Sequence, residues 1–204
     1  MVRQAVELQA FEEARHARVI AGMCRAYGIA AEIEPGYAAP VDAEWAELRM
    51  GYGECFDSFF AFGLFALAER SGFFPPALVR VFEPVIQEEA RHIAFFVNWM
   101  VWSRANRPWW RRPAFRLRCM RALMLQAWKR LKTARGAASK DNFTRKGASS
   151  FDVDIDPKKF FLLCLSENER RMAMFDPRLK RPRAMPAIIG LVARIIPAGK
   201  PKTG

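Results

Sequence analysis

Apolar residues along this chain of 204 residues recur mostly at the spacing of an α-helix, and no segment shows the strict alternation of a half-buried strand. Proline, glycine and serine interrupt this pattern, so they set the expected helix boundaries. The sequence predicts helices at 1–27, 43–70, 75–104, 114–133 and 157–175, followed by a short apolar segment at 187–196. Asp42 is a suitable N-cap for the second helix, and Pro84 is expected to kink the third. We therefore expect an all-α protein.

Composition and spacing divide the predicted helices into segments. Hydrophobic residues make up 51% of the chain and charged residues 26%, which is typical of a globular protein. The sequence predicts a helical bundle at 1–134, a flexible linker at 135–156 and a C-terminal helix with a short apolar segment at 157–204. The longest apolar stretch, 55–68, is too short to span a membrane and contains a charge. The segment 187–196 is expected either to lie at a membrane surface or to pack on the bundle.

The four cysteines, at positions 24, 55, 119 and 164, are scattered and form no Cys-x-x-Cys pair. The chain also starts without the basic and apolar pattern of a signal peptide. Reduced thiols in the cytoplasm are the simplest interpretation, with attachment to the periphery of a membrane as a further option.

The net charge of +12 is unevenly distributed. Residues 1–100 carry 8 basic and 14 acidic side chains, whereas residues 101–204 carry 25 basic and 7 acidic ones. Trp109 and Trp110 lie beside Arg111 and Arg112 in the basic half. Interleaved Trp and Arg suit an acidic carrier protein, a membrane surface or nucleic acid. The alternative is that these Trp side chains cover the end of the bundle.

The pentapeptide Glu-Glu-Ala-Arg-His occurs twice, and each copy ends at one of the only two histidines, His16 and His92. Residues i and i+3 share a helix face, so Glu13 with His16, and Glu89 with His92, present a carboxylate and an imidazole together. Glu54 lies among aromatic residues on the second helix, where a buried charge needs a partner. Carboxylate and imidazole groups are common ligands of iron and manganese. The sequence predicts a two-metal site that contains Glu13, His16, Glu54, Glu89 and His92.

The order Glu54, Glu89, His92 resembles the repeated motif of the ferritin-like di-iron carboxylate superfamily. Acyl-carrier-protein desaturases, ribonucleotide reductase small subunits and arylamine N-oxygenases share this motif. The resemblance covers residues 1–105 and implies a ferritin-like helical bundle with extra C-terminal helices. It also implies one more carboxylate about thirty residues before Glu13, on a first helix that these 204 residues do not include. Either the chain starts late relative to these proteins, or the site lacks this ligand.

The resemblance also implies roles for residues around the metal ligands. Glu12 and Glu88 would orient the opposite histidine, and Arg15 and Arg91 would pair with such acids. The alternative is that Glu12 and Glu88 lie on a solvent-exposed helix face.

Two further predictions concern other parts of the site. Glu167 and Glu169 are candidates for the missing carboxylate, although an exposed polar face is the favoured interpretation. Among the aromatic residues of the second helix, Phe56, Phe59 and Phe60 are expected to be mostly core, and some of them to line a cavity for an apolar or aromatic substrate.

The resemblance implies an oxidase or oxygenase that holds two iron ions, or one manganese and one iron, and uses O2 to oxidise that substrate. One metal position would be only partly occupied if the fourth carboxylate is absent. The sequence does not specify the electron donor, and a second copy of the chain is a further candidate partner. Two alternatives remain open: a non-catalytic metal-binding protein for iron handling, and a basic surface-docking protein on a helical scaffold.

Overall fold

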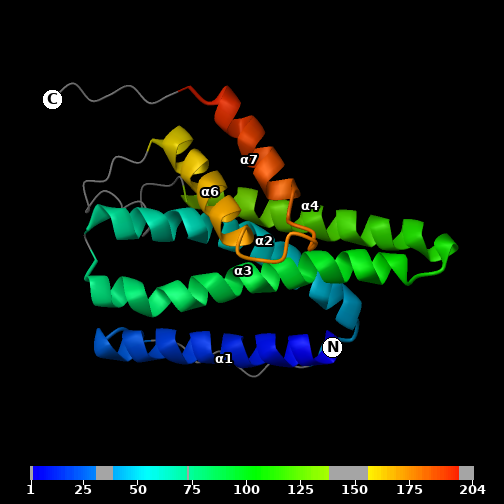
Figure 1. Ribbon diagram of the computed structural model, residues 1–204, viewed down its shortest axis with the longest axis horizontal. Helices are drawn as coiled ribbons and strands as arrows, with labels where there is room; N and C mark the ends of the chain where they lie inside the picture. The colour runs from blue at the N-terminus through cyan, green and yellow to red at the C-terminus, as the bar shows by residue number, and fades with distance from the viewer. Residues whose placement is uncertain (1, 31–38, 73, 138–155, 198–204) are drawn as a thin grey trace. The chain divides into compact units, whose positions relative to one another are not determined.

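The computed structural model describes residues 2–30, 39–72, 74–137 and 156–197, and every regular element in these ranges is helical (Figure 1). The prediction of an all-α protein is confirmed. The chain divides into two compact units, Met1–Ala46 and Glu47–Gly204. No helix within the described ranges combines the length and the apolar character needed to cross a bilayer.

The first unit contains helix α1 (Val2–Ala26) and the start of helix α2 (Ala43–Ser71). Gly28 follows α1 with a φ of 66°, a left-handed conformation that glycine adopts without strain. The carboxylate of Asp42 accepts a hydrogen bond of 2.9 Å from the backbone N–H of Trp45. Asp42 is therefore the N-cap of α2, as the sequence predicts.

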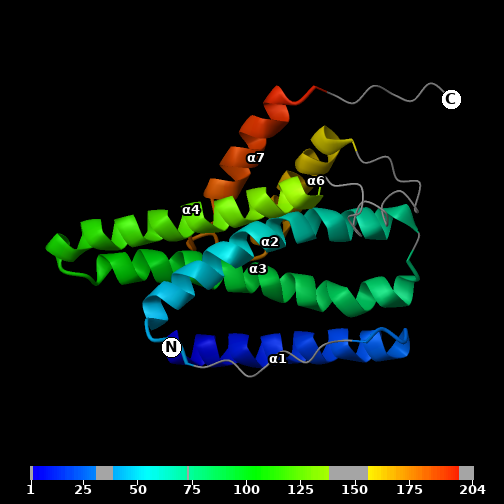
Figure 2. The ribbon, with the colours of Figure 1, turned by 180° about the vertical axis from the view of Figure 1, so that it is seen from behind.

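In the second unit, α2 is followed by α3 (Pro76–Ala105), the 3₁₀ turn η1 (Trp109–Arg111) and α4 (Arg112–Ala137). Helices α2 and α3 run antiparallel, and α4 returns beside α3 (Figures 1 and 2). Helix α4 begins two residues before the predicted position. Pro113 fits in its first turn because the N–H that proline lacks is not needed there for a helix hydrogen bond. Most of the predicted linker, 138–155, lies outside the described residues, and the division into segments at 134 and 157 stays a prediction.

The C-terminal part of the second unit consists of α6 (Pro157–Met172) and α7 (Ala184–Ile195). Asp156 caps α6 because its carboxylate accepts hydrogen bonds from the backbone N–H groups of Lys158 (2.8 Å) and Lys159 (3.4 Å). Helix α7 packs against α6, and its residues Met185, Ile189 and Ala193 are buried. One face of this apolar segment therefore packs on the rest of the unit, which is one of the two alternatives given for it above.

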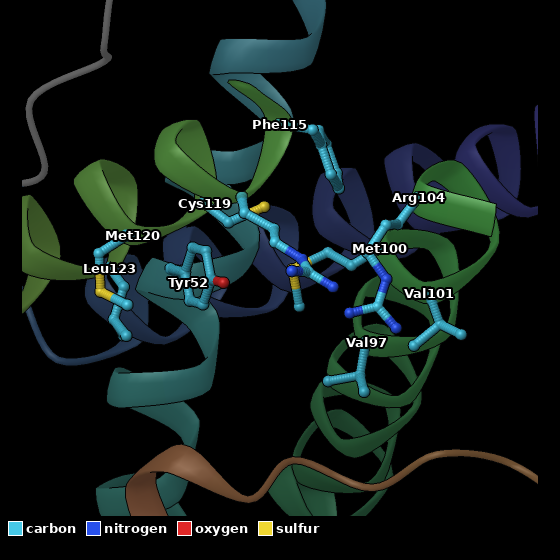
Figure 3. A pocket seen from close by; sticks show the side chains of 10 residues that line it. Tyr52, Val97, Met100, Val101, Arg104, Phe115, Cys119, Met120 and Leu123 are labelled. Carbon is cyan, nitrogen blue, oxygen red and sulfur yellow. The ribbon is translucent and has the colours of Figure 1, made fainter. Parts of the chain in front are cut away.

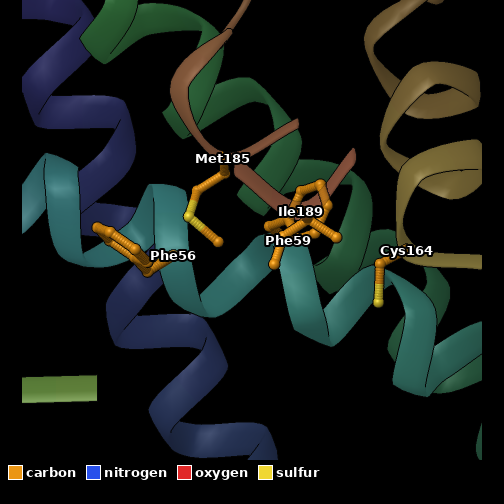
Figure 4. Packing of buried hydrophobic residues seen from close by; sticks show 5 residues of the cluster. All are labelled: Phe56, Phe59, Cys164, Met185 and Ile189. Atoms are coloured by element: carbon orange, nitrogen blue, oxygen red, sulfur yellow. The ribbon is translucent and has the colours of Figure 1, made fainter. Parts of the chain in front are cut away.

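A buried apolar cluster joins α2 to both C-terminal helices (Figure 4). Gly63 allows α6 to approach α2 closely, since a Cβ atom at this position would lie 2.3 Å from Sγ of Cys164. The members of the cluster are Phe56, Phe59, Cys164, Met185 and Ile189.

A buried arginine joins α6 to α3. The side chain of Arg171 is completely buried, and its guanidinium donates hydrogen bonds to both carboxylate oxygens of Glu83, at 3.1 and 3.0 Å. It also donates one of 3.3 Å to Oε1 of Gln87. The guanidinium carbon lies 5.4 Å from the centre of the Phe62 ring on α2. Arg171 therefore connects three helices of the second unit.

Candidate metal centre

In the second unit, the antiparallel helices α2 and α3 bring Glu54 and His92 together. One ligand atom of Glu54 and one of His92 lie within 4.8 Å of each other, close enough to share one metal ion. The side chain of His92 is 1% exposed, and Glu54 is half-buried. A carboxylate and an imidazole at this depth form a donor set that suits a transition metal.

The third predicted ligand of this unit, Glu89, is held by a residue that the sequence analysis did not select. The hydroxyl of the buried Ser58 donates a hydrogen bond of 3.2 Å to Oε2 of Glu89. Ser58 follows Glu54 by four residues and therefore lies on the same face of α2. This spacing gives the helix face of Ser58, but it does not predict the partner of its hydroxyl. The hydrogen bond restricts the rotation of the Glu89 carboxylate.

In the first unit, α1 carries the other Glu-x-x-His pair. Oε2 of Glu13 lies 3.8 Å from Nδ1 of His16, so the i, i+3 spacing places both groups on one side of the helix, as predicted. Glu12 and His16 are the buried residues of α1, whereas about half of the Glu13 side chain is exposed. Each unit thus contains one carboxylate–imidazole pair with ligand atoms less than 5 Å apart.

The acids and arginines of the two repeats have different surroundings. A side-chain nitrogen of Arg91 lies 3.9 Å from Oε1 of Glu88 in the same repeat. Glu12 is buried, and Glu88 and Arg15 are half-buried. Their role in orienting the histidines stays a prediction.

The expectation of an exposed polar face for Glu167 and Glu169 is wrong for Glu167. Its side chain is buried, accepts a hydrogen bond of 2.8 Å from Nε of Arg170 and lies 3.4 Å from a guanidinium nitrogen of Arg70. The rotation of α6 turns Glu167 toward α2, and two arginines compensate its charge there. Glu169, two residues further along α6, is exposed as expected.

The three phenylalanines that the sequence predicts beside the substrate pack mainly against other apolar side chains. Phe56 and Phe59 belong to the buried cluster of Figure 4. The ring of Phe60 stacks on Phe160 of α6, with ring centres 6.5 Å apart. Phe56 also lines a small pocket, described below. A role of these residues in a substrate cavity stays a prediction.

A pocket of about 410 Å³ lies between α2, α3 and α4. Figure 3 shows Tyr52 of α2 with its hydroxyl directed into the space between the side chains of α3 and α4. A second pocket of about 170 Å³ shares four lining residues with it and adds Cys55 and Phe56. The larger pocket is lined by Tyr52, Val97, Met100, Val101, Arg104, Phe115, Arg116, Cys119, Met120 and Leu123.

Burial keeps Cys55, Cys119 and Tyr52 neutral at these pockets. It raises the pKa of Cys55 to about 12, and the charge of the adjacent Glu54 contributes to this shift. Burial also raises the pKa of Tyr52 far above its ordinary value and raises the pKa of Cys119. A hydrogen bond from Tyr52 and the charges of nearby arginines partly oppose the shift of Cys119. At neutral pH these groups are therefore two thiols and a phenol, not anions.

Comparison of the chain with models of protein families, with curated proteins and with solved structures finds no match. The assignment of this site therefore depends on its residues and their geometry.

Proposed function

We propose that this chain is a ferritin-like oxidase or oxygenase whose five predicted ligands hold two iron ions, or one manganese and one iron. The pair of the half-buried Glu54 and the buried His92, brought together from two helices, is the observation that supports this proposal most strongly. The same pentapeptide on α1 supplies the second pair, Glu13 and His16. The family resemblance is the basis for assigning both pairs to one centre.

The donor set of the described residues fits iron or manganese. Three carboxylates offset three of the four positive charges of two divalent ions, so one further anion would complete the balance. A hydroxide or the carboxylate of a substrate is suitable. The hydrogen bond from Ser58 orients Glu89, and the burial of His92 keeps water away from one ligand. When bound, the metal pair would supply electrons for the reduction of O2.

The larger pocket supports an apolar or aromatic substrate. Most of its lining side chains are apolar, and its volume of about 410 Å³ lies within the usual range of small-molecule sites. Tyr52 precedes Glu54 by two residues, and Val97 follows His92 by five. At a rise of about 1.5 Å per residue, these positions lie about 3 and 7.5 Å along the same helices. The pocket therefore lies near the level of the predicted ligands along the two helices, although Tyr52 and Val97 are turned about 160° and about 140° away from Glu54 and His92 around the helix axes.

Oxygen consumption by the iron-loaded chain tests this proposal. The chain is loaded with Fe(II) without oxygen and supplied with ascorbate, which returns oxidised ions to Fe(II), and O2 uptake is then followed with and without a panel of apolar and aromatic compounds. We expect one or more compounds to stimulate repeated uptake in the parent chain. Glu54→Gln, which removes a charge at nearly constant volume, should abolish the stimulation. Met100→Trp, which enlarges a side chain that lines both pockets, should reduce it. Glu169→Gln, at an exposed acid of α6, is the matched control for Glu54→Gln.

The same measurement distinguishes the proposed enzyme from a non-catalytic protein for iron handling. The set of only three carboxylates is the feature that favours this alternative. O2 uptake that no compound in the panel raises above the uptake with ascorbate alone would support it over the enzyme. Iron binding that fails altogether would contradict both functions.

A further inference from the structure

Helix α4 exposes a continuous row of large apolar side chains. At about 100° per residue, these side chains fall within an arc of about 80° around the helix axis. The row extends over fifteen residues, and its first and last members are about 21 Å apart along the axis at 1.5 Å per residue. Its members, with their exposed fractions, are Leu117 (71%), Met120 (56%), Met124 (61%), Trp128 (60%) and Leu131 (44%). We call this set the α4 stripe.

The α4 stripe is not the face by which α4 packs in its unit. The buried side chains of α4 are Phe115, Ala122 and Gln126, which are at most 5% exposed. On the same helical wheel, their directions are about 180° from the centre of the stripe. Helix α4 is therefore apolar on two opposite sides, and only one of them is covered within the described residues. An exposed apolar row of this length usually marks an interaction surface.

The charges of α4 are all of one sign. Its sequence contains arginine and lysine but no aspartate or glutamate. Arg116 lies about 40° beyond one edge of the stripe and Lys132 about 40° beyond the other, and both side chains are exposed. Just before α4, Trp109 and Trp110 are 75% and 62% exposed. An apolar row with basic residues on both sides and Trp nearby is typical of a helix that lies at a lipid surface.

We infer that α4 docks on an anionic lipid bilayer, with the stripe in the apolar boundary and the flanking basic side chains at the headgroups. A second copy of the chain is a poorer occupant, because pairing two stripes would bring two wholly basic helices together. Nucleic acid is also a poorer occupant, because phosphates need basic side chains on the contact face, which here consists of Leu, Met and Trp. This inference does not depend on metal binding, and the docked helix need not span the bilayer.

Co-flotation with lipid vesicles tests the inference. The full chain is mixed with vesicles of phosphatidylcholine, with or without phosphatidylglycerol, at low and high salt. We expect binding only when the anionic lipid is present, and weaker binding at high salt. Leu117→Ser combined with Met124→Ser should lower the partition coefficient about tenfold or more. Arg116→Gln combined with Lys132→Gln should lower it about tenfold at low salt.

Matched controls separate the α4 stripe from general hydrophobicity. Leu64 on α2 and Leu162 on α6 are 49% and 50% exposed, so Leu64→Ser with Leu162→Ser removes apolar surface elsewhere. This variant should bind within about twofold of the parent chain. Far-UV circular dichroism confirms that each variant is folded.

The inference would be overturned if the parent chain did not bind anionic vesicles, or if the stripe variant bound them as well as the control variant does. It would also be overturned if light scattering showed a dimer that only the stripe variant loses, in which case a second copy covers α4. Binding to RNA that is insensitive to the stripe variant, without binding to vesicles, would assign the basic helix to nucleic acid.

Discussion

Replacement of Arg171 by alanine should lower the free energy of unfolding of the second unit by about 3 kcal/mol. The substitution removes two hydrogen bonds to Glu83 and one to Gln87, as well as the contact with the ring of Phe62. Loss of one member of a buried ion pair typically costs about 3–5 kcal/mol. The side chain of Glu83 is 46% exposed, so water can solvate it again, and the lower end of this range applies.

Urea unfolding followed by far-UV circular dichroism measures this change, and Arg178 provides the control. The side chain of Arg178 is 89% exposed and pairs with the exposed Asp176 at 2.6 Å. Because exposed ion pairs contribute little, Arg178→Ala should leave the unfolding midpoint nearly unchanged. Arg171→Met, which retains an apolar stem, should cost less than Arg171→Ala. Equal unfolding midpoints for Arg171→Ala and Arg178→Ala would refute the role of Arg171 as the link between α6 and α3.

Two other predictions concern packing and pH. Gly63→Ala should destabilise the second unit by about 1–3 kcal/mol, because the new Cβ would overlap Cys164. Gly190→Ala, whose new Cβ meets open space on α7, should stabilise the helix by up to about 1 kcal/mol. A higher melting temperature for Gly63→Ala than for Gly190→Ala would contradict the close contact between Gly63 and Cys164. Burial raises the pKa of Cys55 and of Cys164 to about 12 in the folded chain, so the folded state keeps protons that the unfolded state releases. The contribution of these thiols to the free energy of unfolding should be full below the ordinary thiol pKa and should fall between about pH 9 and pH 12. The decrease should be up to about 1.4 kcal/mol per pH unit for each thiol. Cys164→Ser should therefore make the dependence on pH less steep. An identical slope for the Cys164→Ser variant in urea melts would show that its thiol is not protected.

The helices could be predicted because their ends depend on local chemistry. Asp42 caps α2 through its own side chain, and Gly28 follows α1 in a conformation that favours glycine. The predicted start of α4 at 114 is two residues late, since proline can either end a loop or occupy a first helical turn. At Pro113 the second alternative holds, so the helix starts at Arg112.

Within the candidate site, the sequence predicted the side-chain positions that depend on a single helix. It missed the contacts that depend on how neighbouring helices pack. The i, i+3 spacing was enough to predict that Glu13 and His16 lie on one side of α1. The hydrogen bond from Ser58 to Glu89 requires the register between α2 and α3, which no local pattern contains. The burial of Glu167 likewise depends on how α6 is rotated toward α2.

The metal content of the purified chain is the most direct test of the proposed centre. Elemental analysis of protein from iron-replete cells should find about two transition-metal ions per chain. His92→Ala should reduce this number to one or none, Glu54→Ala should lower it without unfolding the helices, and Glu169→Ala should leave it unchanged. A parent chain that contains no iron or manganese, or a His92→Ala variant that retains both ions, would contradict the proposed centre.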